Sequence, residues 1–84
     1  MKQQFDLNYQ FGLYLRRVGF GGRQIPRVQY DEMKRAFFGA CGQILILCRD
    51  DIGAIEDEHE AISTMKSLLD QVGDFWLNET HRNN

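Results

Sequence analysis

Apolar side chains recur at intervals of three and four residues along most of the chain, which is the spacing of one face of an α-helix. They are densest in residues 30–52, where two such lines lie side by side and leave little polar circumference. This pattern predicts a central helix from about residue 28 to residue 52 that is buried on most sides. The first line consists of Tyr30, Met33, Phe37, Ala40, Ile44 and Leu47, and the second of Phe38, Cys41, Leu45, Cys48 and Ile52.

Within this helix, the run Gln43–Cys48 is also compatible with a buried β-strand after a glycine turn, because periodicity does not distinguish the two in short apolar runs. We favour the helix because both apolar lines continue through the run and no partner strand is visible elsewhere. Residues 36–42 also contain two alanines and two glycines. Gly39 and Gly42 together cost on the order of 2 kcal/mol of helix propensity, so we expect another helix to approach closely there.

A shorter amphipathic pattern predicts a first helix over residues 6–18. Asp6 is its expected N-cap, because a carboxylate accepts hydrogen bonds from the free N–H groups of a first turn. Gly19 is expected to end the helix in the left-handed conformation. Residues 19–27 then form the clearest loop of the chain, since they contain three glycines and the only proline.

The second half of the chain predicts a third helix over residues 55–78, followed by a polar tail at 79–84. Gly53 is expected to end the second helix, and Asp50 or Asp51 to cap the third. The apolar residues of the third helix step by three and four in alternation, which is typical of a helix that packs against another helix. They are Ile62, Met65, Leu69, Val72 and Trp76, and Leu68 and Phe75 widen the stripe.

These elements predict an all-α fold in a single domain, residues 1–84, with a short first helix followed by a long antiparallel helical hairpin. Each long helix of ~24 residues would extend ~36 Å. A compact monomer of this size has a radius of gyration of only ~12 Å. The first helix is too short to cover both long helices, so we expect a homo-oligomer built on the second and third helices.

The two cysteines, Cys41 and Cys48, lie two helical turns apart in this arrangement. That separation is roughly 10 Å, which is too far for a disulfide. Thiols without a bridge are typical of a reducing compartment. No initial apolar stretch resembles a signal peptide, and no run reaches the ~20 apolar residues of a membrane span. We therefore predict a cytoplasmic protein that is not associated with a membrane.

Charge divides the chain into a basic first part and an acidic second part. Residues 1–49 contain eight Lys and Arg against three Asp and Glu, a charge of +5. Residues 50–84 contain two against nine, a charge of −7. Such an asymmetry indicates a basic ligand site, subunits that pair head to tail, or solvated faces that satisfy helix dipoles.

Six positive charges fall within twenty residues of the basic part and are interleaved with aromatic side chains. Arginine binds phosphate through two parallel hydrogen bonds, and an aromatic ring can stack on a base. This composition predicts an anionic, phosphate-bearing nucleotide as ligand. The alternative is a solvated basic surface, or one that forms salt bridges with the acidic third helix of a neighbouring subunit. The candidate residues are Arg16, Arg17, Arg23, Arg27, Lys34 and Arg35 for phosphate, and Tyr30 or Phe20 for stacking.

Catalytic and cofactor patterns are weak throughout the chain. Glu56 and His59 have the Glu-x-x-His spacing of di-metal helical bundles, but we interpret this segment as a solvated acidic turn. Neither cysteine has a histidine nearby in sequence, so both are interpreted as buried structural thiols. We therefore predict a protein that is not an enzyme and holds no metal or cofactor. The net acidity and the lack of a recognisable helix-turn-helix argue against nucleic acid as a partner.

The acidic segment 50–60 supports a different function. Clustered carboxylates can attract a basic partner and can mimic nucleic acid. The alternative hypothesis is therefore a protein-interaction module, or an inhibitor of a host protein, that acts through its acidic third helix.

A set of residues spread over the second and third helices forms a distinctive pattern, and it consists of Gln29, Glu32, Lys34, Arg35, Ala36, Phe37, Gly42, Gln43, Gln71 and Val72. With this pattern the chain resembles, over roughly residues 5–79, short uncharacterised proteins of bacterial and of phage or prophage origin. A looser likeness is to phage-encoded sponge proteins, which are small helical oligomers that sequester cyclic-nucleotide immune signals in basic pockets at subunit junctions. The likeness implies a cyclic nucleotide as ligand, an anti-defence role and a bacterial host cytoplasm, but it transfers no site residue.

Overall fold

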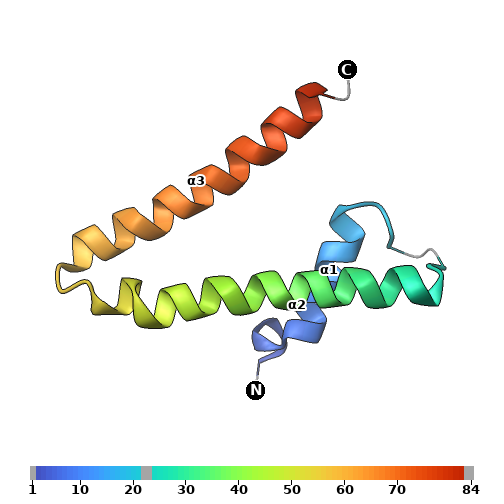
Figure 1. Cartoon of the computed structure of the whole chain (residues 1–84), viewed down its shortest axis with the longest axis horizontal. Helices are drawn as coiled ribbons and strands as arrows, with labels where there is room; N and C mark the ends of the chain where they lie inside the picture. The colour runs from blue at the N-terminus through green and yellow to red at the C-terminus, as the bar shows by residue number, and fades with distance from the viewer. Residues whose placement is uncertain (1, 22–23, 83–84) are drawn as a thin grey trace. The chain divides into compact units, whose positions relative to one another are not determined.

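The computed structural model describes residues 2–21 and 24–82, and every regular element within these ranges is helical (Figure 1). The all-α prediction is therefore confirmed, and α2 passes through Gln43–Cys48, so the strand alternative for that run is wrong. The elements are the 3₁₀-helix η1 (Gln3–Phe5), α1 (Leu7–Arg17), α2 (Arg27–Asp50), the 3₁₀-helix η2 (Ile52–Ala54) and α3 (Glu58–Arg82).

The chain divides into two compact units, residues 1–44 (unit 1) and residues 45–84 (unit 2). The boundary falls inside α2, so unit 1 contains α1 and most of α2, whereas unit 2 contains the end of α2 together with η2 and α3. The hairpin pairing of the two long helices and the assembly into a homo-oligomer stay predictions.

The two ends of α1 form as the sequence predicts. At the start, the Asn8 N–H donates a hydrogen bond of 2.8 Å to Oδ1 of Asp6, which is therefore the N-cap. At the end, Gly19 has a φ of +92°, a conformation that a residue with a Cβ adopts only with strain. The Gly19 N–H donates to the Arg16 carbonyl and the Phe20 N–H donates to the Leu15 carbonyl at 2.8 Å. This pair of bonds is a Schellman motif, which satisfies carbonyls that the helix end leaves free.

The core of unit 1 is a cluster of aromatic rings where α1 crosses the first half of α2 (Figure 1). Phe11, on α1, is only 2% exposed. Its ring centroid lies 5.5 Å from that of Tyr30 and 5.3 Å from that of Phe37, and Tyr14 lies 5.4 Å from Phe37. Such tilted and edge-on pairs stabilise a core beyond the apolar area they bury.

Helix α2 begins at Arg27, where the Tyr30 N–H donates to the Pro26 carbonyl. Its predicted close contact with another helix at Gly39 and Gly42 is absent from the single chain, because no described atom lies within 4 Å of the position a Cβ would occupy at either glycine. The expectation rested on helix propensity, which does not say what lies beside a small residue.

The base of unit 2 is a short turn that follows α2. Ile52 is 8% exposed and belongs to η2, so the second helix ends at Asp50 rather than at residue 52 as predicted. A Cβ at Gly53 would lie 3.3 Å from the Cys48 carbonyl oxygen, so this glycine allows the turn to fold tightly against the end of α2. Cys48 Sγ lies 3.8 Å from Met65 Sδ, which joins the last turn of α2 to α3.

The predicted start of the third helix is wrong. Helix α3 begins at Glu58 rather than at residue 55, and its cap is Asp57 rather than Asp50 or Asp51. The His59 N–H donates to Asp57 Oδ1 at 2.9 Å, and the Ala61 N–H donates to the Asp57 carbonyl.

The predicted tail at 79–84 is also partly wrong, because α3 continues through Arg82. The Thr80 hydroxyl donates to the Trp76 carbonyl, so this polar residue is accommodated within the helix. Among the residues that the structure describes, no helix combines the length and the hydropathy that crossing a bilayer requires.

Candidate functional site

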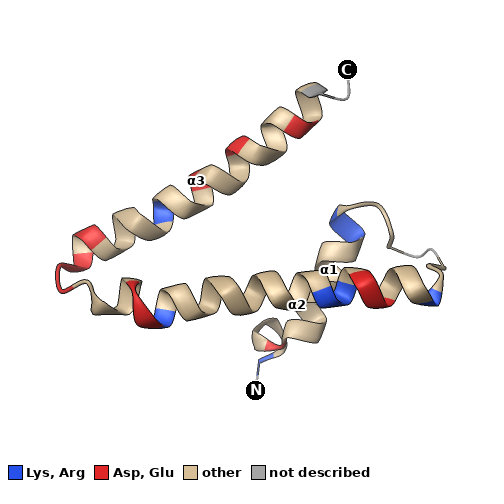
Figure 2. Ribbon diagram, in the orientation of Figure 1, with Lys and Arg blue, Asp and Glu red and all other residues tan. Residues whose placement is uncertain are grey.

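The predicted ligand-binding residues separate into two groups in unit 1 (Figure 2). Arg16 and Arg17 form the last turn of α1, where positive charge is favourable to the helix dipole. The second group lies on the first turns of α2, and Arg23 lies outside the described residues. Within the described part of the chain, no hydrogen bond or ion pair joins the two groups. The second group consists of Arg27, Tyr30, Lys34 and Arg35.

The turn that follows α1 lies against the stem of Arg16. A Cβ at Gly21 would lie 2.6 Å from Arg16 Cγ and 3.3 Å from Arg16 Cβ, which is too close for any side chain. Gly21 therefore allows the backbone to fold onto the aliphatic stem of Arg16. Arg16 and Arg17 themselves stay exposed.

Lys34 lies between two aromatic rings on the surface of α2. Its Nζ is 5.9 Å from the ring centroid of Tyr30 and 5.9 Å from that of Phe38. These rings are one helical turn before and one turn after the lysine, the spacing at which helix side chains meet. Cation–π contacts of this kind contribute about 0.5–1 kcal/mol at exposed sites. They hold the ammonium group of Lys34 without neutralising its charge.

A shallow hollow of about 370 Å³ lies beside this lysine and opens to solvent. Its lining consists of Asp31, Lys34, Arg35 and Phe38. The volume falls near the lower end of the ~300–1,000 Å³ of ligand pockets. Neither cation of the lining forms an ion pair with a carboxylate of the described residues. Their positive charge is therefore available to an anionic ligand.

Asp31 introduces a negative charge into the same hollow. Its Oδ2 accepts a hydrogen bond of 3.3 Å from Arg27 Nε, in an exposed pair one helical turn apart. Exposed pairs of this kind contribute little to stability. Arg27 thus offsets the carboxylate charge from outside the hollow, and two unpaired cations stay within it.

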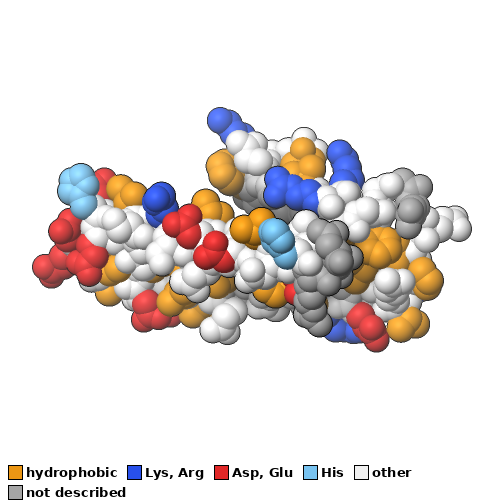
Figure 3. All heavy atoms as spheres, turned by 90° about the horizontal axis from the view of Figure 1, so that it is seen from above, with side chains coloured by type: hydrophobic (Ala, Val, Ile, Leu, Met, Phe, Trp, Pro, Cys, Tyr) orange, Lys and Arg blue, Asp and Glu red, His pale blue; other side chains and the backbone are white. Residues whose placement is uncertain are grey.

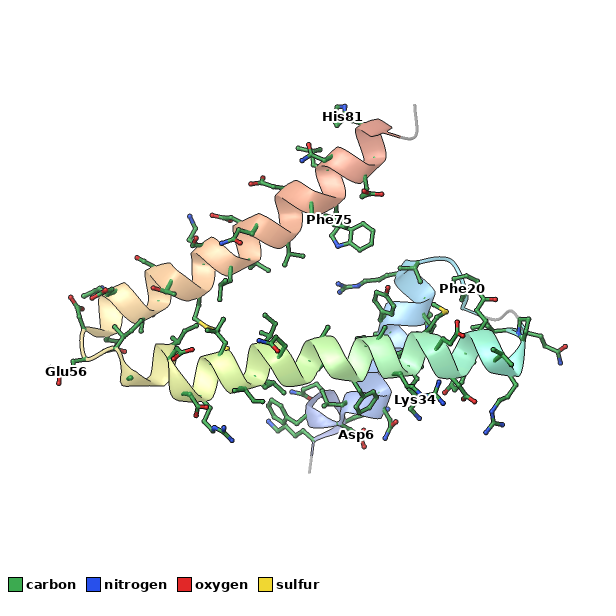
Figure 4. All side chains as sticks on the ribbon, viewed as in Figure 1. Asp6, Phe20, Lys34, Glu56, Phe75 and His81 are labelled. Atoms are coloured by element: carbon green, nitrogen blue, oxygen red, sulfur yellow. The ribbon has the colours of Figure 1, made fainter. Side chains whose placement is uncertain are left out.

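The aromatic residues predicted to stack on a base have other places in the structure. Tyr30 packs edge-on against Phe11 and belongs to the core. Phe20 and Lys34 lie on opposite sides of α2 in Figure 4. The ring that lines the hollow is that of Phe38.

In the sequence, Phe38 belongs to the second apolar line of α2 and Asp31 lies near the start of that helix. Neither was therefore predicted to belong to the ligand site. The signal that could have found them is their spacing from Lys34, at four residues and three residues along a helix.

The acidic segment has a different structure from the one predicted. Glu56 precedes α3 and Asp57 caps it, so Glu56 and His59 do not share a helical face as the Glu-x-x-His interpretation requires. In the ranges that the structure covers, no group of three or more His, Cys, Asp or Glu side chains is arranged to hold a metal ion.

Comparisons of this chain with protein-family models, with curated proteins and with solved structures each found no match. The predicted resemblance to phage proteins therefore stays a prediction. The candidate site is supported by its own residues, namely the unpaired cations and the ring beside them.

Proposed function

We propose that this chain is a small, non-enzymatic homo-oligomeric protein that binds a phosphate-bearing nucleotide in the hollow on α2. The observation that carries the proposal is the presence of Lys34 and Arg35, without carboxylate partners in the described residues, next to the ring of Phe38.

Each lining residue has a role that matches its chemistry. Arg35 presents a planar guanidinium that can form two parallel hydrogen bonds to a phosphate, and Lys34 adds a point charge. A base stacked on Phe38 contributes about 1–3 kcal/mol. Asp31 accepts hydrogen bonds, so it favours a hydroxyl or an amino group at the other end of the ligand and disfavours a second phosphate there.

The size and openness of the hollow define the ligand further. A volume of about 370 Å³ is large enough for one nucleotide unit. Because the hollow is open, we expect a second copy of the chain to cover it, as in the predicted pocket at a subunit junction. In a single chain the proposed phosphate contacts with Lys34 and Arg35 would be exposed to solvent. The affinity of the chain for the nucleotide should therefore fall as salt concentration rises.

Calorimetry of the full chain at low salt, against linear and cyclic mononucleotides and dinucleotides, tests this proposal. The double variant Lys34→Gln/Arg35→Gln should weaken binding at least ~30-fold, since each charge-assisted hydrogen bond contributes about 1.5–3 kcal/mol. The matched control Lys2→Gln/Lys66→Gln removes the same charge outside the hollow and should retain binding. Absence of binding to every nucleotide, or equal losses in both double variants, would contradict the proposal.

A second candidate function has its own supporting observation. Glu56, Glu58 and Glu60 are exposed and form no ion pair within the described residues. Figure 3 shows that acidic side chains gather on the surface at one end of the molecule. They therefore offer a free acidic surface to a basic protein. A pull-down should retain one defined partner on the wild-type chain and lose it when these three residues become lysine. Retention by the triple variant would exclude this function.

A further inference from the structure

The four residues that line the hollow are ordered along the surface of α2. Successive residues of an α-helix rise by about 1.5 Å and turn by about 100°. Asp31 and Phe38 therefore lie almost in line, about 20° apart around the helix and about 10 Å apart along it. Lys34 and Arg35 lie at the level between them, one on each side of that line. Along α2 the lining thus presents a carboxylate, then two cations, then an aromatic ring.

The middle and the far end of this line are held by contacts within unit 1. Nζ of Lys34 is 5.9 Å from the ring centroid of Tyr30, one turn before it, and 5.9 Å from that of Phe38, one turn after it. The ammonium group therefore stays at the middle level. The ring of Phe38 packs at 68° against that of Phe37, with 5.9 Å between the centroids, and Phe37 contacts the buried Phe11. The ring at the far end is therefore anchored to the core.

Asp31 holds the other end of the line and can still accept a hydrogen bond. Its Oδ2 accepts from Arg27 Nε at 3.3 Å, whereas its Oδ1 accepts no hydrogen bond from the described residues. A carboxylate has about four acceptor positions and, when ionised, no donor. A ligand group beside Asp31 is therefore favoured when it donates a hydrogen bond and disfavoured when it is negatively charged.

This order distinguishes between kinds of phosphate. When a base stacks on Phe38 and its phosphate lies between the two cations, the far side of the phosphate faces Asp31. In a nucleoside diphosphate or triphosphate, that side carries another phosphate. Two like charges about 4 Å apart weaken binding by about five-fold even at the dielectric constant of water. In a phosphodiester, that side carries a second sugar, whose hydroxyl groups can donate to the carboxylate.

The lining provides cations at one level only. Lys34 and Arg35 are adjacent in sequence, so both can reach the same phosphate. The next cation toward the start of the helix is Arg27, which lies outside the lining and is paired with Asp31. A ligand with one phosphate therefore uses both cations, whereas additional phosphates would meet no further cation of the hollow.

We propose that the hollow selects a linear dinucleotide, in which one phosphodiester joins two nucleosides, and that Asp31 determines this specificity. Phe38 stacks on one base, and Lys34 and Arg35 hold the bridging phosphate. Asp31 accepts a hydrogen bond from the sugar beyond the phosphate and repels a terminal phosphate at the same place. The inference rests on the proposed function and deepens it, because it names the class of nucleotide.

Calorimetry of the full chain at low salt tests the selectivity with three adenine ligands. They are the dinucleotide ApA, adenosine 5′-methyl phosphate, which is a diester without a second sugar, and ADP, which carries a second phosphate. The wild-type chain should bind ApA at least ~5-fold more tightly than either of the others, although ADP carries more charge. Binding of ADP or of the methyl ester as tight as that of ApA would overturn the proposal.

The variant Asp31→Ala tests the residue that makes the distinction. It should bind ADP about five-fold more tightly than the wild-type chain does, and its preference for ApA over the methyl ester should disappear. The matched control Glu32→Ala removes the same charge from an exposed neighbour outside the lining and should keep the wild-type order. An unchanged order in Asp31→Ala, or equal changes in both variants, would contradict the role of Asp31.

Two further ligands test the limit to one phosphodiester. A hexanucleotide of adenosine and the cyclic form of the dinucleotide contain additional diesters, so neither should bind more than ~10-fold more tightly than ApA. Tighter binding of either would overturn the linear dinucleotide as ligand. If none of the ligands binds, the proposed function fails as well. If they bind, lose affinity in Lys34→Gln/Arg35→Gln and show a different order, only the inference about Asp31 fails.

Discussion

Units 1 and 2 use similar apolar patterns in different ways. In unit 1, two helices cross and enclose Phe11 among the rings of Tyr30 and Phe37. In unit 2, Ile52 of η2 is buried, whereas most of the apolar stripe on α3 is exposed. The units also differ in charge, since residues 1–44 contain seven basic and three acidic residues, or +4, and residues 45–84 contain three and nine, or −6.

The difference between the units shows how much the spacing of apolar residues says about packing. Steps of three and four residues identify the face of a helix that avoids water, but they do not identify what covers it. In unit 1 another helix of the same unit covers the apolar face, whereas in unit 2 most of the apolar face of α3 is exposed. The two units therefore should respond differently to substitutions of their apolar residues.

The chain contains separate optical probes of the two units. All three tyrosines lie in unit 1, at positions 9, 14 and 30, and the only tryptophan, Trp76, lies in unit 2. Near-ultraviolet dichroism of tyrosine and fluorescence of tryptophan therefore report on the units independently.

The largest expected effect is that of Phe11→Ala. Removing a buried phenylalanine costs about 3–5 kcal/mol, because the cavity cannot be filled completely. Urea unfolding should show that the tyrosine transition shifts to lower denaturant or disappears, with a smaller change in the tryptophan signal.

Phe5→Ala is the matched control, because Phe5 is 68% exposed. It should change stability by less than about 0.5 kcal/mol. Equal effects of the two substitutions would mean that the aromatic cluster is not the core of unit 1.

Two glycines of the first helical segment should respond in opposite directions to substitution by alanine. Gly19→Ala should destabilise unit 1 by about 1–2 kcal/mol, because the φ of +92° brings a Cβ too close to the backbone. Gly12→Ala should stabilise it by about 0.5–1 kcal/mol, since the position is helical and no described atom lies within 4 Å of the added Cβ. Thermal unfolding followed by tyrosine dichroism measures both, and destabilisation by Gly12→Ala would reveal a close contact at α1.

The caps of α1 and α3 provide a matched pair across the two units. Asp6 and Asp57 each accept a hydrogen bond from the N–H two residues later, at 2.8 and 2.9 Å. Replacement by alanine should cost about 1 kcal/mol at each site, whereas asparagine should retain most of the stability. Helicity and unfolding midpoints measure this, and an Asn variant as unstable as the Ala variant would show that charge, rather than the cap, is important.

The smallest expected effect concerns the pair at the end of α2. Two hydrogen bonds from Arg49, at 2.7 and 3.0 Å, lower the pKa of the Asp50 carboxyl. A lowered pKa in the folded state gives a contribution that is present above the unfolded pKa of about 4 and is lost as pH falls through the folded value. Carboxyl titration by NMR should show a midpoint below the ordinary value that returns to it in Arg49→Gln. An ordinary midpoint in the wild-type chain would show that the pair does not persist in solution.

Helix type and several helix ends could be predicted from sequence because they depend on local chemistry. The apolar lines of the central segment predict α2, and an aspartate and a glycine at the right positions predict the two ends of α1. These signals act within one or two turns, so they are visible in a single sequence.

The start of α3 and the contact patch of α2 could not be predicted in the same way. Asp50, Asp51 and Asp57 are all suitable caps, and the choice follows from burial of Ile52 in η2, which is a tertiary effect. Gly39 and Gly42 allow a close approach without requiring one.

The candidate site was predicted in part. The positive charges were visible as a cluster in sequence, but helix geometry divides them between the end of α1 and the start of α2. The hollow is lined by Asp31 and Phe38, one turn before and one turn after Lys34, and this spacing is visible in the sequence. That these side chains surround an open space is a property of the folded chain that the spacing does not specify.

Helix α2 also has a consequence for how the chain unfolds. The boundary between the units, at residues 44 and 45, lies within this helix, so its ladder of backbone hydrogen bonds crosses the boundary. Ending the helix there would leave four carbonyls without partners, and starting a new one would repeat the cost of nucleation. Melting of one unit should therefore fray α2 past the boundary by a turn or so, and the amide protons near the boundary should exchange with solvent together.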